Sequence, residues 1–225
     1  MSGNIKYTLK RGKRKTLAVS IRDGVVTVKV PRGTTQDDID RFLAKHAEWI
    51  EKKLAEYGAK TDMLKPVTDG QAILYHGVLV PISRAAERGR IKLEGGVLSV
   101  PNKYESAEKE AAAIAAWYKR LAADELSALL KDYSTRTGLS YNSFDLTNAR
   151  TKWGSCDGKC NIRLNWRLVM LDGEINEYVI IHELAHTVHH DHSAAFWAEV
   201  KKHLPKYAAQ RKRLKIFSTV TSLYR

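Results

Sequence analysis

The sequence is short of several features that mark particular classes of protein. Its 225 residues include only two cysteines, Cys156 and Cys160, which excludes a disulfide framework. No apolar run approaches the roughly 20 residues that a membrane-spanning helix needs. The segment Met1–Lys15 is polar and basic and lacks the apolar stretch of a secretory signal. We therefore expect a soluble, cytoplasmic protein with no membrane partner.

Acidic residues are absent from both ends of the chain. Seven Lys or Arg residues lie between Lys6 and Arg22, eight lie between Val200 and the C-terminus, and the formal net charge is +13. Such an excess favours a polyanionic partner. No signature of an RNA- or DNA-binding module accompanies the charge, and there is no Gly-x-x-x-x-Gly-Lys phosphate loop. Non-specific, salt-sensitive nucleic-acid binding through the basic termini is one interpretation, and a solvated surface that aids solubility is the other.

The first 104 residues are predicted to form a β-rich region with one helix. Apolar residues alternate on both sides of the turn-forming pair Asp23-Gly24, which indicates two strands. Thr35 is a suitable N-cap for a helix with apolar residues at helical spacing, and Lys65-Pro66 is a helix breaker. The predicted elements are strands over 17–21 and 26–30, a helix over 36–57, a linker over 59–70 and a β-rich stretch over 72–100.

Residues 105–225 are predicted to form a second region, richer in helix. A long alanine-rich helix is expected to end at Gly138, and Asp157-Gly158 is typical of a tight hairpin turn. Ser193 is a suitable cap for the last predicted helix, which ends before Pro205. The predicted elements are helices over 106–136, from about 174 and from about 193, with hairpin strands over 149–156 and 160–169.

The segment from His182 to His186 reads His-Glu-Leu-Ala-His, the H-E-x-x-H pattern of zinc sites. Histidines four residues apart lie on one helix face, so both imidazoles can reach the same metal ion. Glu183 lies ~100° around the helix and can instead reach a water on that metal. Zinc lowers the pKa of such a water toward ~7, and Glu183 can act as its general base. Polar groups in so apolar a helix are costly without a role.

A catalytic zinc site needs a third protein ligand. His192 is favoured, because a helix break between His189 and Asp191 would let its ring fold back to the metal from a second direction. Glu199 is the carboxylate alternative. His189 shares the helix face but would lie roughly 10 Å along the axis from His182, and a site that used His190 would displace His182.

Beyond this motif, the chain resembles the YgjP-like metallopeptidase family and, more distantly, the SprT-like proteases. The similarity extends over nearly the whole chain. The blocks that carry it are Arg150–Cys156, Asn161–Leu168, Tyr178–His186, Asp191–Ser193 and Phe196-Trp197, with the segment from Arg14–Leu17 through Val30-Pro31 and the helix ending at Trp49-Ile50 in the amino-terminal half.

The resemblance implies an α+β fold, with a zincin-like catalytic domain over 105–225 following the β-rich region 1–104. In that domain a small antiparallel sheet would pack on the active-site helix, and an edge strand would line the cleft. It also implies that His182, His186 and His192 bind zinc, that Glu183 is the base, and that the substrate is a peptide or protein. Tyr178 is expected in the core, and no residue stands out as an oxyanion partner.

Two other functions stay open at this stage. Members of the family have also been assigned UTP pyrophosphatase activity, so a metal-dependent nucleotide hydrolase is one alternative. A nucleic-acid-associated protein with a closed, structural zinc site is the other, and the basic termini motivate it. The two cysteines are expected to be unreactive, and Trp153 and Trp166 to pack across the hairpin.

Overall fold

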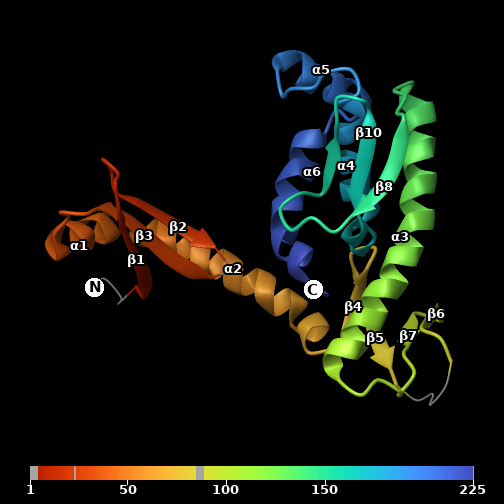
Figure 1. Ribbon diagram of the computed structural model, residues 1–225, viewed down its shortest axis with the longest axis horizontal. Coiled ribbons are helices and arrows are strands. Elements are labelled where there is room, and N and C mark those ends of the chain that lie inside the picture. Colours follow the sequence, from red (N-terminus) through yellow and green to blue (C-terminus); the bar gives the residue numbers. More distant parts are fainter. Residues whose placement is uncertain (1–4, 23, 85–88, 225) are drawn as a thin grey trace. The chain divides into compact units, whose positions relative to one another are not determined.

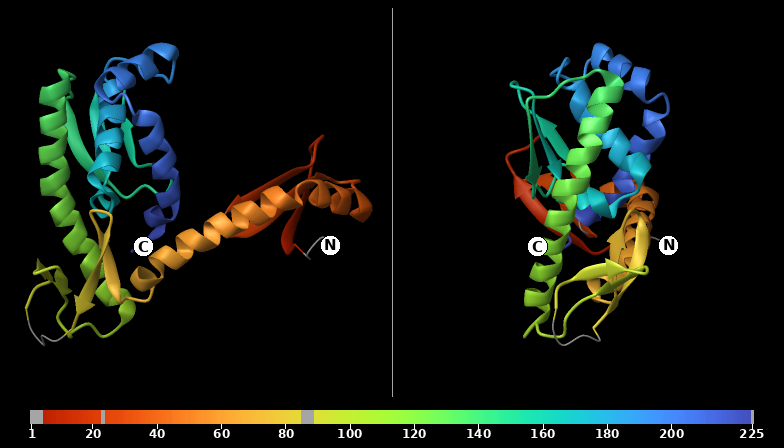
Figure 2. Two further views of the ribbon diagram at one scale, coloured as in Figure 1. Left: turned by 180° about the vertical axis from the view of Figure 1, so that it is seen from behind. Right: turned by 90° about the vertical axis from the view of Figure 1, so that its right-hand side faces the viewer.

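The computed structural model describes residues 5–22, 24–84 and 89–224. The chain divides into two compact units, an N-terminal unit over 1–64 and a C-terminal unit over 65–225. Figures 1 and 2 show the elements of each unit. In the described residues, no helix combines the length and apolar composition needed to cross a bilayer. The predicted functional division at residues 104 and 105 stays a prediction.

The N-terminal unit is a three-stranded sheet packed against two helices. The central strand β3 pairs in parallel with β1 and antiparallel with β2. Alternate residues of β3 are buried, as a strand with one covered face requires. The elements are β1 (Tyr7–Gly12), β2 (Ala18–Arg22), β3 (Val25–Pro31), α1 (Gln36–Lys45) and α2 (Ala47–Thr68).

Apolar side chains from the sheet and both helices form the core of this unit. Thr35 caps α1 as predicted, and its side chain and that of Asp38 each bond the other's backbone N–H. The two predicted strands are confirmed as β2 and β3, although Asp23 of the predicted turn lies outside the described residues. The buried cluster consists of Val26, Val28, Val30, Ile39, Leu43 and Ile50.

Two predictions for this unit are wrong. The single helix is broken at His46, and the predicted linker over 59–70 is the last part of α2, which continues to Thr68. Pro66 removes one helix hydrogen bond, but the turn still closes because the N–H of Asp69 donates to the carbonyl of Lys65. Near the end of a helix a proline leaves few bonds to lose.

The C-terminal unit begins with a four-stranded sheet and a long helix. The strand order is β4-β5-β7-β6, which confirms the predicted β-rich stretch. Helix α3 (Ala107–Thr137) is capped by the Ser106 side chain and ends at Gly138, whose φ of 74° suits glycine. The strands are β4 (Ala72–Tyr75), β5 (Val78–Ser83), β6 (Lys92–Glu94) and β7 (Val97–Ser99).

A second sheet of this unit has the order β8-β10-β9. The predicted hairpin is confirmed, since β9 and β10 pair antiparallel. The sheet is not purely antiparallel as predicted, because β8 pairs with β10 in parallel. The remaining elements are β8 (Ser143–Thr147), β9 (Gly154–Cys156), β10 (Asn161–Asn165), η1 (Trp166–Met170), α4 (Gly173–Ala185), α5 (Ala194–His203), α6 (Tyr207–Leu214) and η2 (Lys215–Ser222).

Helix α4 lies at the centre of the C-terminal unit, in contact with α3, α5, α6 and β9 (Figure 1). Its buried residues are spread around the helix instead of forming one stripe, which is typical of a helix in the interior. Asp172 caps its first turn, and Arg213 of α6 pairs with both Asp172 and Glu174. These contacts fix the helix that carries the H-E-x-x-H motif, and the chain is a mixed α+β protein as predicted.

Candidate metal centre

Three histidine side chains converge at the end of α4. His182 lies in the last turn of α4, His186 directly follows it, and His192 lies just before α5. Their ligand atoms are all within 4.8 Å of one another. In the described part of the chain, this is the one group of three or more His, Cys, Asp or Glu residues arranged to hold a metal ion.

A reversal of the chain after α4 brings His192 back to the other two histidines. The helix ends at Ala185, before the break predicted between 189 and 191. Ring atom Nδ1 of His186 lies 2.9 Å from the carbonyl oxygen of His189, to which it can donate. That bond leaves Nε2 of His186 for a metal and orients the ring. The chain from His189 onward thus supports the site through its backbone.

Two of the imidazole nitrogens are as close together as two ligands of one metal ion. The Nε2 atoms of His182 and His192 are 3.2 Å apart. Two nitrogens bound to one tetrahedral zinc at ~2.0–2.1 Å lie roughly 3.3 Å apart, so the spacing fits. Burial, and then the neighbouring histidines, lower the pKa of His182 to about 3, and burial lowers the pKa of His186. Both rings are therefore neutral, the form that binds metal.

Aromatic side chains of α5 hold the three imidazoles. Phe196 is fully buried, and its ring stacks on His186 with centroids 4.4 Å apart. The edges of His182 and His192 meet the same ring at 4.9 Å each. Trp197 packs 5.7 Å from both His182 and His192, measured between centroids. Both aromatic residues belong to the Phe196-Trp197 block, which is one of the blocks that carry the family resemblance.

The Glu183 side chain lies on a different side of α4, against strand β9. A Cβ atom added to Gly154 would come within 2.6 Å of the Glu183 Cγ and Oε1 atoms, so only glycine fits there. Glu183 is 6% exposed and accepts no hydrogen bond from the described residues. Burial raises its pKa to about 8, and the Lys152 ammonium acts in the opposite direction. A buried carboxylate without such bonds is costly to folding.

A cavity of about 180 Å³ lies beside His182 and Glu183. The side chain of Tyr178 is 4% exposed, and burial raises the pKa of its phenol to about 12. Tyr178 lines this cavity, and its hydroxyl has no hydrogen-bond partner among the described residues. The lining residues are Lys152, Trp153, Gly154, Tyr178, Val179, His182, Glu183 and Leu214.

The sequence assigned Tyr178 to the core and left Lys152 without a role. One signal was available for Tyr178, because it precedes His182 by four residues and so shares its helix face. Lys152 reaches Glu183 only through the placement of β9, which no local pattern reveals. Trp153 lines the cavity, whereas Trp166 is buried and bonds Asn148.

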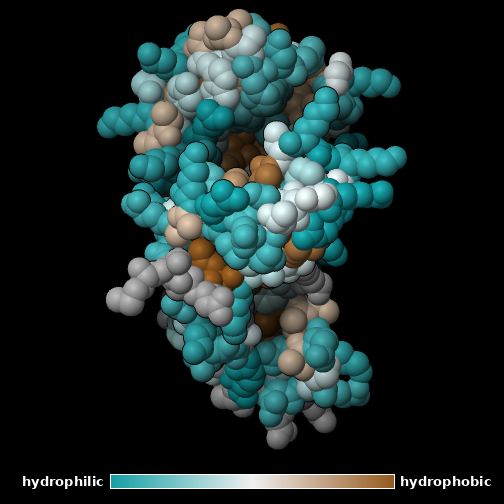
Figure 3. Space-filling model, turned by 90° about the vertical axis from the view of Figure 1, so that its left-hand side faces the viewer, coloured by the Kyte–Doolittle hydropathy of each residue, from teal (hydrophilic) through white to brown (hydrophobic). Residues whose placement is uncertain are grey.

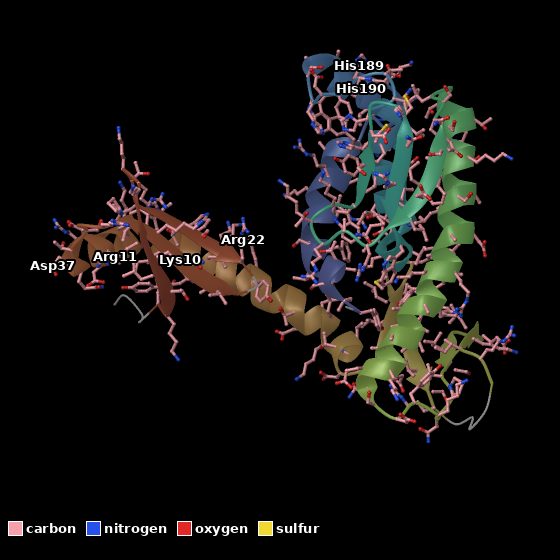
Figure 4. The ribbon with its side chains drawn as sticks, viewed as in Figure 1. Lys10, Arg11, Arg22, Asp37, His189 and His190 are labelled. Atoms are coloured by element: carbon pink, nitrogen blue, oxygen red, sulfur yellow. The ribbon has the colours of Figure 1, made fainter. Side chains whose placement is uncertain are left out.

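The other candidate ligands lie elsewhere. Glu199 accepts hydrogen bonds from His203 at 2.8 Å and Lys202 at 3.2 Å. His189 and His190 lie on the connection between α4 and α5 (Figure 4). Cys156 and Cys160 are free thiols, and burial raises the pKa of Cys156 to about 11, which makes it a poor nucleophile.

A family model and a solved structure are similar to this chain. The family model described as "YgjP-like, metallopeptidase domain" matches residues 15–217. The crystal structure of the metallopeptidase zymogen of Pyrococcus abyssi abylysin is similar at 25% sequence identity, covering 40% of this chain and 90% of its own, with a TM-score of 0.37. No curated protein matches the chain.

Proposed function

The chain belongs to the YgjP-like metallopeptidase family, and from this premise we propose that it is a zinc peptidase in which Glu183 is the general base. The observation that carries the proposal is the convergence of three imidazoles beside the buried side chain of Glu183. As a metallopeptidase the protein is a hydrolase. We further propose a cytoplasmic location, which its free cysteines support.

In this proposal His182, His186 and His192 hold the zinc ion. Three imidazole nitrogens are a common ligand set for catalytic zinc, which keeps a position open. When bound, the ion polarises the substrate carbonyl and makes water more acidic. The chain contributes the fixed ligand geometry, since Phe196 and the His189 carbonyl orient the rings.

Glu183 accepts a proton from the attacking water and returns it to the leaving amine. Its burial and its contact with Gly154 hold the carboxylate in one place, so that little reorganisation accompanies proton transfer. Tyr178 donates a hydrogen bond to the oxygen that gains negative charge during the reaction. Three observations support this role: its hydroxyl lacks a partner among the described residues, the residue lines the cavity, and the raised pKa keeps the phenol protonated at neutral pH.

The substrate is an extended peptide that pairs with β9. This strand lies at the edge of its sheet, and Gly154 contacts Glu183 directly. An edge strand offers free backbone N–H and C=O groups to an added strand. The cavity beside Glu183 has a single lysine in its lining, which suits a peptide better than a triphosphate.

Metal analysis together with a protease assay tests the proposal. We expect about one zinc per chain in the purified protein and loss of zinc from His192→Ala, with His190→Ala as the matched control. Hydrolysis of casein or of a peptide library should stop with a chelator and return with zinc. Glu183→Gln should keep the metal and lose roughly 10²–10⁴-fold in kcat. Zinc-loaded protein that cleaves no peptide would remove the peptidase assignment.

The role of Tyr178 has its own test. Tyr178→Phe removes only the hydroxyl, so we expect kcat to fall roughly 10²-fold with little change in KM. Zinc content and melting temperature should stay the same, because no described residue forms a hydrogen bond with the hydroxyl. An unchanged kcat would show that Tyr178 only packs.

A further inference from the structure

One face of the N-terminal sheet is not covered by α1 or α2. Successive side chains of a strand point to opposite faces, and the buried valines of β3 define the covered one. The other face carries the exposed side chains Lys10 and Lys29 together with hydroxyl groups. We call it the basic sheet face; Ala18 and Val25 also lie on it, and its polar residues are Thr8, Lys10, Ser20, Arg22, Thr27 and Lys29.

The strand register brings cations together on this face. Lys10 lies directly opposite Lys29 on the neighbouring strand, a like-charge pair that costs stability. Neither lysine, nor Arg22, has an ion pair or hydrogen bond within the described ranges. Fold stability therefore does not explain why Lys10 and Lys29 lie opposite each other. A bound ligand of opposite charge would explain it.

The hydroxyl groups form a row across the same three strands. Thr27 lies opposite Thr8 on one side and Ser20 on the other. These hydroxyls can donate to the oxygens of an anion whose charge the lysines neutralise. The face thus combines point charges with short hydrogen-bond donors, and its strands contain no Asp or Glu.

Charges are segregated within the unit. Residues 5–35 contain nine Lys or Arg and one Asp, whereas residues 36–64 contain five Lys or Arg and seven Asp or Glu. Figure 4 shows Lys10 and Arg22 on the strands and Asp37 on α1. Arg11 is not part of the basic sheet face, because its guanidinium bonds the carbonyls of Arg32 and Thr34.

We propose that the basic sheet face binds the phosphate backbone of nucleic acid without reading its sequence. Lysine and hydroxyl donors without acceptor carboxylates suit phosphate oxygens. The face carries no aromatic ring for stacking on bases, so base recognition is not expected. An acidic protein partner fits less well, because protein interfaces have an apolar centre and here the exposed Val25 stands at one end. Figure 3 shows one side of the molecule, where most of the visible surface is hydrophilic and several small hydrophobic patches interrupt it.

Fluorescence anisotropy with the full chain tests this proposal. The probes are labelled single-stranded 30-mers of two unrelated sequences and a duplex, over a range of salt. The test variant is Lys10→Gln/Arg22→Gln/Lys29→Gln, and the control Lys45→Gln/Lys52→Gln/Lys53→Gln removes equal charge from the helices. Wild type should bind both sequences equally. The test variant should bind at least about tenfold more weakly, and its log–log salt slope should fall by about 2, or ~0.7 per lost phosphate contact.

The control and a Lys10→Arg/Lys29→Arg variant should bind as wild type does. Casein hydrolysis by the test variant should be unchanged, which separates this proposal from the peptidase assignment. Equal losses of binding affinity in the test and control variants would show that only net charge matters and would overturn the proposed site. So would equal binding of polyglutamate, absence of binding by wild type, or preference for one sequence. Circular dichroism checks that each variant is folded.

Discussion

In the N-terminal unit the buried cluster is entirely apolar, whereas the C-terminal unit buries Asn165, Arg167 and Glu183 among its apolar residues. Asn165 and Arg167 are hydrogen-bonded, the first to the Ala149 and Lys152 carbonyls and the second to Asn148 and Leu223. Glu183 receives no such bond from the described residues. The comparison separates two buried polar side chains that hold neighbouring segments by hydrogen bonds from Glu183, whose carboxylate no such bond holds.

The largest expected effect follows from the contact between Gly154 and Glu183. In Gly154→Ala the new methyl group displaces the carboxylate, and we expect kcat/KM for a peptide to fall about 10³-fold, within the range that a general base contributes. Zinc content should be unchanged. The control is Gly158→Ala, since a Cβ there meets nothing within 4 Å. Equal activities of the two variants would show that Glu183 tolerates displacement.

A core substitution in the N-terminal unit should lower stability and leave the peptidase activity unchanged. Ile50 is fully buried in an apolar cluster, and Ile50→Ala should lower the free energy of unfolding by about 3 kcal/mol. The specific activity of the folded protein should not change, because the site lies in the other unit. Urea unfolding and casein hydrolysis measure the two effects, with exposed Lys52→Ala as the control. Lost specific activity in folded Ile50→Ala would break the distinction between the units.

Two helix caps offer a matched pair of smaller effects. Thr35 caps α1 and Ser193 caps α5. Each change to alanine should cost about 1 kcal/mol of stability. Only Ser193→Ala should also lower zinc affinity, because Ser193 follows His192 and begins the helix that carries Phe196. Thermal melts and competition with a zinc chelator check this, and equal zinc affinities would contradict it.

The smallest effects are expected for two partly exposed carboxylates, one in each unit. Hydrogen bonds from Thr35 lower the pKa of Asp38, and hydrogen bonds from Asn161 and then Lys159 lower the pKa of Asp157. Their stabilising effect is present above the unfolded pKa and is lost as the pH falls through the lowered folded pKa. Asp38→Ala and Asp157→Ala should therefore have a lower melting temperature than wild type at pH 7. At pH 2 their melting temperatures should equal that of wild type. A difference that persists in acid would point to packing instead.

Elements that depend on local sequence signals were predicted well. Elements that depend on pairing between distant segments were predicted poorly. The helix from Ser106 to Gly138 could be predicted because its capping serine and its terminating glycine directly flank it in the sequence. Strand β1 was missed, because its charged sequence shows little alternation and it pairs in parallel with β3. The parallel partner of β10 was missed for the same reason. Pro66 misled the prediction because breaker residues report local preference alone.

By itself the sequence determined the H-E-x-x-H pair, because helical periodicity alone places His182 and His186 on one face. It also determined that Glu183 points elsewhere. Tertiary structure alone decided which further histidine approaches, what supports the rings, and which strand meets the carboxylate. Those outcomes depend on how α5 and β9 pack against α4, and packing between distant segments follows from shape and volume that no local spacing records.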